Sequence, residues 1–524
     1  MCYNLRMHSS PISATRRGFL KGGLLAAAAF PFIGHARGLN GRATLALIGA
    51  GKQGRGLLHS FLGQDLVVTA VCDCDRARRE DRARVVNDYY AQRAQLGVPG
   101  TVCRAVADFR EVLADPSVDM VCIATPDHWH AYMAVEAMKA GKDVYCEKPL
   151  VHTVEEARLV MEASAKTGRI LQTGAMQRSG LEFRTACEIV RNGFIGRVKL
   201  VDANFGGPSR PHRDYENPDN AAAEGAPNPD VDFDMWCGPA PLAKYSDRLA
   251  PRGVHGFFPM FWRYDDWFGL GMCGDWGAHH LDIAQWGLGC DETGPVKVVR
   301  SDVAPSKGRF DGGRRQRGAQ LVFADGCVVR HAPFTGSDFG TVFYGEEGIV
   351  AVNRGRLAVW RGKGVSPDQD LQARLNDGSF DGMERVAFWN SAATSASASS
   401  ASAASGRDRS PNGPRGDGRR PSDRSLLDAV NKATKAFRLK KAPVKLYKAL
   451  GHPADFVDCF RSRRQPCSHA GIGARSAILS ILCNLSYVHD TGFGWDPAKN
   501  VFADGTGDAR WLAKDYRGDW KVRL

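Results

Sequence analysis

The chain has 524 residues, of which 43% are hydrophobic and 24% are charged. This length and composition are typical of a globular protein with two or three domains and large cores, not of a fibrous or disordered chain. More than half of the net charge of +13 comes from two short segments, 1–37 and 407–424. No basic stripe interleaved with aromatic residues occurs, so we expect no nucleic-acid partner.

The 14 cysteines show no paired spacing of the kind that binds zinc. We therefore expect no metal site and no disulfide scaffold, although individual disulfide bridges stay open. Beyond the N-terminal region no apolar run reaches membrane-spanning length, so no membrane contact is expected of the mature chain.

Residues 1–36 read as a targeting segment. Arg16 and Arg17 precede the short, weakly apolar run 22–33, and small residues follow it. This order predicts a twin-arginine export signal, and a mature chain in the periplasm or beyond it. A short membrane anchor is the weaker reading, because the run is short and rich in alanine and glycine. Since this route carries folded proteins into a compartment without a nucleotide pool, any nucleotide should be tightly bound.

Residues 42–172 predict a dinucleotide-binding domain. A buried strand (44–48) leads directly into a glycine-rich turn and a helix-compatible segment (55–62). The turn supplies the expected cofactor-binding residues Gly49, Gly51, Lys52, Gln53 and Gly54. Its glycines let the backbone approach a pyrophosphate at the helix N-terminus. A second strand (66–72) ends at Asp73, an acid suited to ribose hydroxyls, so NAD is favoured over NADP.

The alternation of strands and helices continues through this domain. Helices are expected at 89–96, 109–114 and 131–140, and strands at 120–124 and 143–146. Polar clusters follow the two strands: Thr125, Pro126 and His130 after the first, and Glu147 and Lys148 after the second. Because ligands of parallel sheets bind beyond the strand carboxyl ends, both clusters are expected to face the cofactor.

Residues 173–390 predict a second domain. We expect strands at 170–173, 198–205, 296–303, 320–323, 327–331 and 341–344, with a hairpin turn at 345–348, and helices at 155–167 and 183–192. The segment 391–424 is Ser/Ala-rich and then Arg/Gly/Pro-rich, and predicts a disordered insertion. Helices at 454–461 and 472–488 place 425–524 as a C-terminal part that completes the second domain.

One stretch of the second domain carries four ionisable side chains within eight residues: Asp275, His279, His280 and Asp282. In a helix, Asp275 and His279 would share a face, and a carboxylate beside an imidazole is a general acid/base arrangement. The alternative is a helix cap at Asp275 with a structural histidine in the core.

Taken together, the glycine-rich turn, the motif 124–130, the motif 146–149 and the motif Asp275–His279 resemble the Gfo/Idh/MocA family of nicotinamide-dependent oxidoreductases. Its exported branch shares the segments 236–241 and 495–497. The resemblance implies an α/β fold: an N-terminal Rossmann domain plus an α/β domain with a large, open, mostly antiparallel sheet.

The resemblance also implies roles for residues. Lys148 would assist proton transfer, His279 would be the general base and Asp275 its orienting partner. Thr125, Pro126 and His130 would line the nicotinamide end of a tightly bound NAD, with Glu147 beside them. We add Gln177, Arg178, Arg263 and His280 as candidate substrate contacts, with a structural ion pair as an equal alternative for Arg178.

Three functions remain open at this point. The first is an NAD-dependent dehydrogenase acting on a secondary hydroxyl of a sugar, inositol or glycoside, expected as a homo-oligomer. The second is NAD-dependent glycoside cleavage through transient oxidation and elimination. The third is a catalytically silent nucleotide-binding sensor, against which the joint presence of Lys148, Asp275 and His279 argues.

Overall fold

A computed structural model describes residues 42–95, 102–212, 227–254, 261–302, 317–333, 339–363, 382–390 and 424–524, together with Leu375, Gly378 and Phe380. The predicted export signal at 1–36 and all but the last residue of the predicted insertion at 391–424 lie outside these residues.

The first sheet is the predicted parallel sheet. Six strands pair in the order β3-β2-β1-β4-β5-β6, and every pairing is parallel. The strands are β1 (Thr44–Ile48), β2 (Val67–Cys72), β3 (Arg104–Val106), β4 (Met120–Ile123), β5 (Asp143–Cys146) and β6 (Leu171–Thr173). Because the chain reverses its direction of winding between β1 and β4, the carboxyl ends of these strands form the crevice in which a dinucleotide binds. The Rossmann prediction is confirmed.

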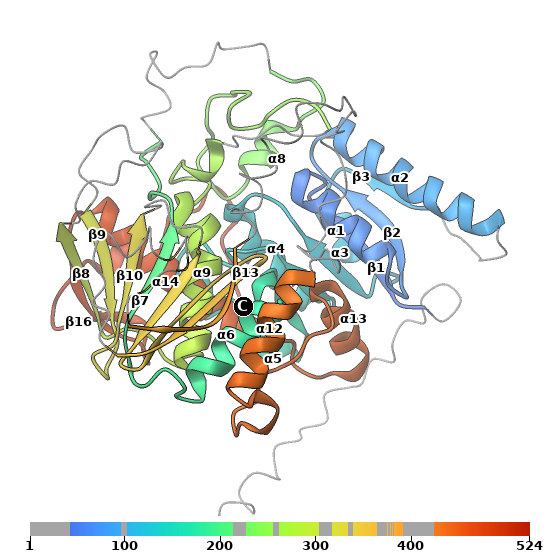
Figure 1. Cartoon of the computed structure of the whole chain (residues 1–524). Coiled ribbons are helices and arrows are strands. Elements are labelled where there is room, and N and C mark those ends of the chain that lie inside the picture. The colour runs from blue at the N-terminus through green and yellow to red at the C-terminus, as the bar shows by residue number, and fades with distance from the viewer. Residues whose placement is uncertain are drawn as a thin grey trace, which may run out of the picture. The chain divides into compact units, whose positions relative to one another are not determined.

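Helices α1 (Lys52–Leu62), α2 (Arg76–Gln95), α3 (Phe109–Ala114), α4 (His130–Lys139) and α5 (Val154–Thr167) connect these strands (Figure 1). Helix α2 is much longer than the predicted segment 89–96. Its sequence is dominated by charged residues, and only Arg82, Ala83, Val86 and Tyr90 are buried. So few apolar positions give a weak helical periodicity, and the pattern revealed only the C-terminal half.

The second sheet has ten strands among the described residues, in the order β14-β13-β12-β11-β7-β10-β9-β8-β15-β16. Its strands are β7 (Val198–Phe205), β8 (Lys297–Asp302), β9 (Arg317–Val322), β10 (Val328–Pro333), β11 (Thr341–Gly345), β12 (Gly348–Asn353), β13 (Arg356–Arg361), β14 (Glu384–Asn390), β15 (Phe493–Asp496) and β16 (Val501–Ala503). All pairings are antiparallel except β7 with β10. The predicted hairpin turn is confirmed by the pairing of Gly345 with Gly348.

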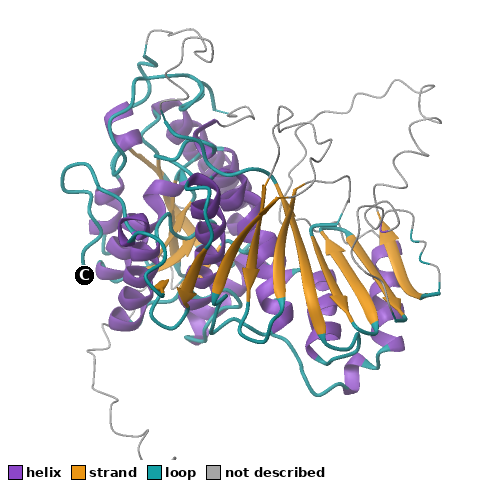
Figure 2. Cartoon of the chain, turned by 90° about the vertical axis from the view of Figure 1, so that its left-hand side faces the viewer, coloured by secondary structure: helices purple, strands orange, loops and turns teal. Residues whose placement is uncertain are grey.

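Helices pack on this sheet from one side, behind the strands in Figure 2. They are α6 (Leu181–Arg191), α9 (Ala278–Leu288), α12 (Arg424–Ala436) and α14 (Ala470–Val488). Among the described residues, α14 is the one helix whose length and composition would suit a membrane span, and 78% of its apolar window is buried inside the protein. It packs against α5, α9, β8 and β9, so it links the two sheets.

The C-terminal segment contacts both domains, and not only the second as expected. Helix α13 (His452–Ser462) packs on the first domain, where the Phe456 ring lies against Phe61 and Tyr145. Strands β15 and β16 extend the edge of the second sheet. The final residues then return to the first domain, where Trp520 packs edge-on against Trp129 and Tyr132.

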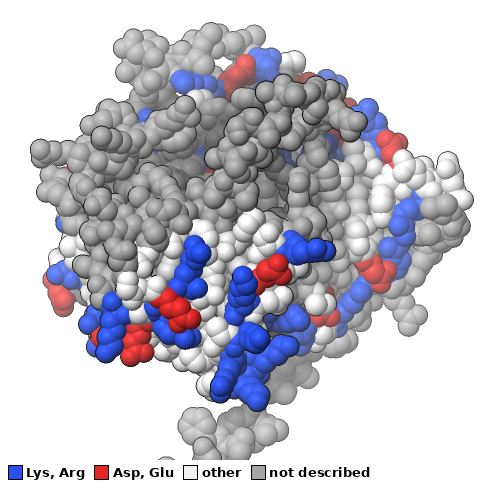
Figure 3. All heavy atoms as spheres, viewed as in Figure 1, with Lys and Arg blue, Asp and Glu red and all other residues white. Residues whose placement is uncertain are grey.

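Acidic and basic side chains are interspersed over much of the face seen in Figure 3, with one denser group of basic side chains towards its lower edge. Several form exposed pairs, such as Arg361 with Glu384 and Arg464 with Asp458. The thirteen cysteines in the described part of the chain are all free thiols, and most of them are buried.

Candidate active site

The glycine-rich turn lies at the carboxyl end of β1. Gly49 has a φ of +93°, and a Cβ there would lie 2.6–2.7 Å from backbone atoms of Ala124 and Thr125. A Cβ on Gly54 would lie 1.9 Å from the Gly49 carbonyl oxygen. No side chain caps α1 at Gly51, and its first turn holds no acid. The turn therefore fits a pyrophosphate at the N-terminus of α1, as the sequence predicts.

Two acids tie this turn to the neighbouring strands. Asp73, at the end of β2, accepts hydrogen bonds from the Ala50 N–H (2.7 Å) and the Asp75 N–H (2.9 Å). A carboxylate has about four lone-pair sites, so Asp73 can still accept ribose hydroxyls. Gln53 donates its Nε2–H to Glu147 (2.9 Å), which is buried at the end of β5. Burial raises the pKa of Glu147 against the opposing effect of Lys148.

His130 is corrected from a cofactor ligand to a positioning residue. Its ring is buried, with Nδ1 2.7 Å from the Pro149 carbonyl oxygen and Nε2 2.9 Å from that of Thr125. Burial lowers the pKa of His130 to about 4. Both ring nitrogens are thus occupied by the backbone. The ring joins the turn after β4 to the turn after β5, which keeps Thr125, Pro126 and Lys148 close together.

Lys148 forms an ion pair with Asp275 across 127 residues of sequence. Its Nζ also donates to the Asp275 backbone oxygen (3.2 Å), and the Arg263 Nε lies 3.4 Å from the same carboxylate. Although burial alone would raise the pKa of Asp275, the two cations hold it well below its usual range. Asp275 is therefore an anion that fixes the position of the Lys148 ammonium.

The expected pair between Asp275 and His279 does not form: within the described residues, no hydrogen bond joins them. Asp275 lies in a π-helical turn, Cys273–Gly277, and His279 lies in the first turn of α9. The i→i+5 bonding of a π-turn adds a residue per turn, which moves Asp275 off the helix face that His279 would share in a regular α-helix. Glycines on both sides of Asp275 and Trp276 were a sequence signal of this irregularity.

His279 is buried, with 4% of its surface exposed, and its Nδ1 has no hydrogen-bond partner among the residues that the structure describes. Burial holds the pKa of His279 well below its usual value, and the charges of Arg354 and Lys148 act in the same direction. The imidazole is therefore neutral, with a nitrogen free to accept a proton. The site thus combines a fixed ammonium with a neutral base.

Arg354 is a site residue that the sequence analysis missed. It lies in the two-residue turn between β12 and β13, where Asn353 pairs with Arg356. Its guanidinium carbon lies 4.8 Å from the centroid of the Trp276 ring, directly after Asp275 in the chain. Burial lowers the pKa of Arg354, whereas Asp275 and Glu147 raise it. No local motif marks this residue, because a hairpin turn far from the other motifs places it.

Of the two roles left open for Arg178, the structure shows the structural ion pair. Arg178 is 2% exposed, and its Nε donates to both oxygens of Asp282 (2.9 Å) while Nη2 donates to Asp291 (2.7 Å). Burial opposes its charge, but the two carboxylates raise the pKa of Arg178 above its usual value. Asp282 lies on α9, one turn from His279. The network therefore holds α9 to the end of β6.

His280 also makes a structural contact, and its role as a substrate contact stays a prediction. Its Nδ1 hydrogen-bonds the Asn204 carbonyl oxygen, and its ring packs so closely on Gly340 that a Cβ there would lie 2.3 Å from Nε2. Gln177 stays a candidate, since it is buried and neither atom of its amide has a hydrogen-bond partner. Arg263 stays one as well, through its contact with Asp275.

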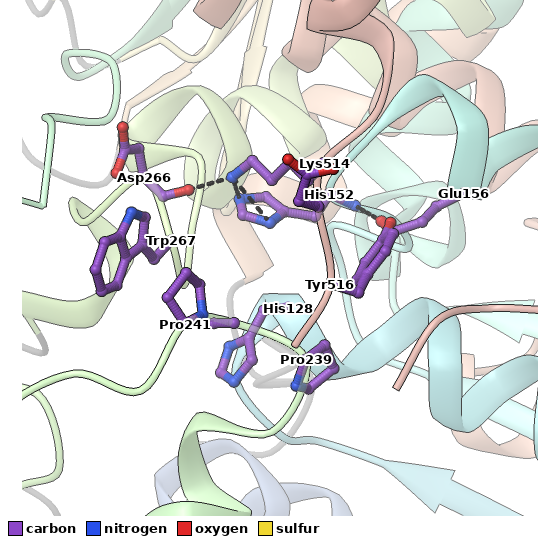
Figure 4. Close-up of a pocket in the computed structure, with 11 residues that line it drawn as sticks. His128, His152, Glu156, Pro239, Pro241, Asp266, Trp267, Lys514 and Tyr516 are labelled. Atoms are coloured by element: carbon purple, nitrogen blue, oxygen red, sulfur yellow. Dashed lines mark hydrogen bonds between the residues drawn. The ribbon is translucent and has the colours of Figure 1, made fainter. Parts of the chain in front are cut away.

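A cavity of about 290 Å³ lies on another side of the turn after β4 (Figure 4). His128, His152, Glu156, Pro239, Ala240, Pro241, Asp266, Trp267, Lys514, Asp515 and Tyr516 line it. Lys514 binds the Asp266 carbonyl oxygen, and Tyr516 donates to Glu156 (2.8 Å). Neither Lys148, Asp275 nor His279 lines the cavity, so it is separate from the site described above.

In the described part of the chain, no group of three or more His, Cys, Asp or Glu side chains could hold a metal ion.

Two family models match successive parts of the chain. Residues 43–175 match the Gfo/Idh/MocA oxidoreductase family model for the NAD-binding Rossmann fold. Residues 215–339 match the model for the C-terminal α/β domain of the same family. The first match ends just after β6, and the second contains the stretch from Arg263 to His280.

Curated relatives are similar over part of their length. The inositol 2-dehydrogenase of Rhodococcus jostii is 34% identical over 131 residues, which are 24% of this chain and 35% of the relative. Glycosyl hydrolase family 109 protein 2 of Shewanella sp. (strain ANA-3) is 30% identical over 162 residues, 31% of this chain and 34% of the relative. The chain thus spans about a third of the length of each.

Among solved structures, levoglucosan dehydrogenase in complex with NADH and levoglucosan aligns with a TM-score of 0.48 and 19% identity. The alignment covers 86% of this chain and 99% of that structure. With its NAD-binding Rossmann domain followed by the family's C-terminal α/β domain, the chain belongs to the Gfo/Idh/MocA family of oxidoreductases.

Proposed function

We propose that the protein is an NAD-dependent dehydrogenase that oxidises a secondary hydroxyl of a sugar, inositol or glycoside. The observation that carries this proposal is the juxtaposition of the Lys148–Asp275 ion pair and the neutral His279 at the carboxyl ends of a nucleotide-binding sheet. The partial likeness to an inositol 2-dehydrogenase supports the substrate class.

Bound NAD would supply the hydride acceptor. Residues of this chain would then bind the substrate hydroxyl and remove its proton. The Lys148 ammonium donates two of its hydrogen bonds to Asp275, which leaves a third for the substrate oxygen. An ammonium cannot accept a proton, so His279 takes it at Nδ1. The role of Asp275 changes accordingly: it positions Lys148, and not His279.

The cofactor-binding residues are proposed from the geometry of the turns. Gly49, Gly51, Lys52, Gln53 and Gly54 would hold the pyrophosphate, and Asp73 the ribose. Thr125, Pro126 and Glu147 would border the nicotinamide. An acid at Asp73 would repel a 2′-phosphate, which favours NAD over NADP.

We also propose export by the twin-arginine route to the periplasm or beyond, on the sequence of residues 1–36. A tightly bound cofactor would then have to be reoxidised in place, by a second carbonyl substrate. The homo-oligomeric state stays a prediction.

The test begins with nucleotide quantification. The purified protein is denatured, and the released NAD(H) and NADP(H) are measured against the protein concentration. Sugars, inositols and glycosides are then screened for reduction of the bound cofactor by its absorbance. A preparation without nucleotide that also fails to bind added NAD would overturn the proposal. Bound NAD with no reduction by any polyol would favour the silent sensor instead.

A second candidate function is glycoside cleavage through transient oxidation, favoured by the similarity to a family 109 glycosyl hydrolase. Transient oxidation acidifies a neighbouring C–H bond, and the same base could then remove that proton. We rank this function second. Release of an aryl aglycone without net formation of NADH would reverse the order.

A further inference from the structure

Arg354 carries a positive charge that the described protein does not neutralise by direct contact. In the described part of the chain its side chain makes no hydrogen bond or ion pair, and its Nε is buried without a partner. Its guanidinium instead stacks on the Trp276 ring, with the guanidinium carbon 4.8 Å from the ring centroid. Arg354 is only partly buried, so water reaches part of its guanidinium, but the buried Nε is left for a ligand to satisfy.

The neighbouring carboxylates are already engaged. Asp275 is held by Lys148 and Arg263. Glu147 accepts hydrogen bonds from Gln53 and from the Lys148 N–H. Lys148 and Arg263 thus share the Asp275 carboxylate, whereas Arg354 is influenced by Asp275, Glu147 and Glu182 from a distance. Within the described residues, none of these three carboxylates forms an ion pair with Arg354.

The turn that carries Arg354 is fixed to the body of the domain. The Gly355 N–H donates to Glu182 at the start of α6 (3.2 Å), and the Arg354 N–H donates to the Asn353 side chain (2.9 Å). The first bond anchors the turn to α6 and the second is internal to the turn, while the stacking on Trp276 positions the guanidinium for a ligand. A planar guanidinium binds a carboxylate through two parallel hydrogen bonds.

We propose that Arg354 binds the carboxylate of an acidic sugar, a uronate or an aldonate, and thereby sets the substrate class of the site. This inference rests on the proposed dehydrogenase function and narrows its substrate. Neutral sugars would leave the guanidinium unpaired, and such a mismatch discriminates against them. The hydroxyl to be oxidised would lie near Lys148 and His279, with the carboxylate towards Trp276.

Matched ligand pairs test this proposal. D-Glucuronate differs from D-glucose, and D-galacturonate from D-galactose, by a carboxylate in place of a hydroxymethyl group. D-Gluconate with D-glucitol extends the panel to aldonates. Binding to the nucleotide-loaded protein is measured by calorimetry and by the shift of its thermal midpoint, and turnover by reduction of the bound cofactor.

We expect at least one acid to bind about tenfold or more tightly than its neutral counterpart. In Arg354→Gln the Kd and KM for that acid should rise about tenfold or more, with a smaller change in kcat and little change for the neutral sugar. Arg361→Gln is the matched control, because Arg361 lies on the same hairpin and pairs with Glu384 at the surface. It should leave the preference intact.

The outcomes separate this inference from the proposed function. If no acid in the panel binds better than its neutral partner, or if the preference survives in Arg354→Gln, the inference is overturned. Loss of bound nucleotide in Arg354→Gln would overturn it as well, since the arginine would then serve the cofactor. If acids bind through Arg354 but nothing reduces the cofactor, the dehydrogenase proposal fails while the carboxylate site stands.

Discussion

Two charged clusters meet α9 and its preceding turn, and they differ in how completely their charges are paired. Arg178, Asp282 and Asp291 form a closed network, in which the guanidinium is 2% exposed and hydrogen-bonds both carboxylates. In the other cluster, Lys148 and Asp275 pair, but the buried Nδ1 of His279 and Nε of Arg354 have no partner.

This difference distinguishes the side chains that stabilise the fold from those available for the proposed reaction. In the Arg178 network the guanidinium and both carboxylates already have partners of opposite charge, which fits a role in holding elements in place. Unsatisfied polar atoms in a buried site are tolerated where a ligand satisfies them. One helix thus carries Asp282 for stability and His279 for the proposed reaction, one turn apart. The predictions below test this separation, from the largest expected effect to the smallest.

The largest effect is expected for the proposed base. His279→Gln should lower kcat roughly 10²- to 10⁴-fold, the usual contribution of general base catalysis. Because the Nδ1 of His279 has no partner in the fold, the free energy of unfolding should stay within about 1 kcal/mol of the parent value. Urea unfolding and single-turnover reduction of the bound cofactor measure the two effects. His489→Gln is the control, since this ring stacks on Trp511 away from the site. An unfolded or fully active variant would contradict the assignment.

The reverse pattern is expected for the closed network. Arg178→Met leaves Asp282 and Asp291 without their counter-ion, and breaking a buried ion pair costs about 3–5 kcal/mol. The free energy of unfolding should fall by that amount, or the variant should not accumulate as folded protein. Any folded fraction should retain its bound nucleotide. If Arg178→Met were as stable as the parent but inactive, the division between the clusters would be wrong.

A buried histidine outside both clusters, His331, predicts a pH dependence of stability. The ring of His331 stacks on Phe205 with a centroid distance of 3.8 Å, and burial lowers its pKa from 6.5 to about 4. Between pH 6.5 and about 4, His331 is protonated in the unfolded chain but stays neutral in the folded chain. Stability is therefore lost as the pH falls through this window, by at most about 1.4 kcal/mol per pH unit from this residue.

His331→Gln should remove that contribution, so its stability should depend less steeply on pH between 6.5 and about 4. Urea unfolding of both proteins across this window measures the difference in slope. Parallel curves for the two proteins would show that His331 titrates in the folded state as it does in the unfolded chain.

The smallest effect is expected at the surface. Arg361 and Glu384 pair at 3.4 Å on neighbouring strands, with side chains 45% and 65% exposed. Water screens such pairs, so Arg361→Gln and Glu384→Gln should each change the free energy of unfolding by less than about 1 kcal/mol. A double-mutant cycle isolates the pair. A coupling as large as that of the Arg178 network would mean that burial does not explain the contrast between the clusters.

The sequence predicted the first domain well because its signals are local. Apolar strands, the turn around Gly49 and the polar residues that end β4 and β5 each lie within a few positions of one another. The second sheet was harder, since β7 pairs with β10 and β11 more than a hundred residues away. The strands β13, β14, β15 and β16 were not anticipated, and Arg354, in the turn before β13, was missed with them.

The pairing of the site residues was also hard to predict, because the partners lie far apart in the sequence. Local spacing suggested Asp275 as the partner of His279, whereas Asp275 binds Lys148, 127 positions earlier. In the same way Arg178 meets Asp282 across 104 positions. A helical pattern shows which side chains share a face in a regular helix. It does not show the π-turn at Cys273–Gly277. Nor does it show that Lys148, from the first domain, pairs with Asp275 in that turn.

The return of the C-terminal residues to the first domain has a consequence for the order of biosynthesis. Trp520 fills a position against Trp129 and Tyr132, and Tyr516 satisfies the buried Glu156 of α5. These residues are synthesised long after the first domain. The nucleotide-binding domain, although encoded first, therefore reaches its complete packing only once residues 516–520 have been made.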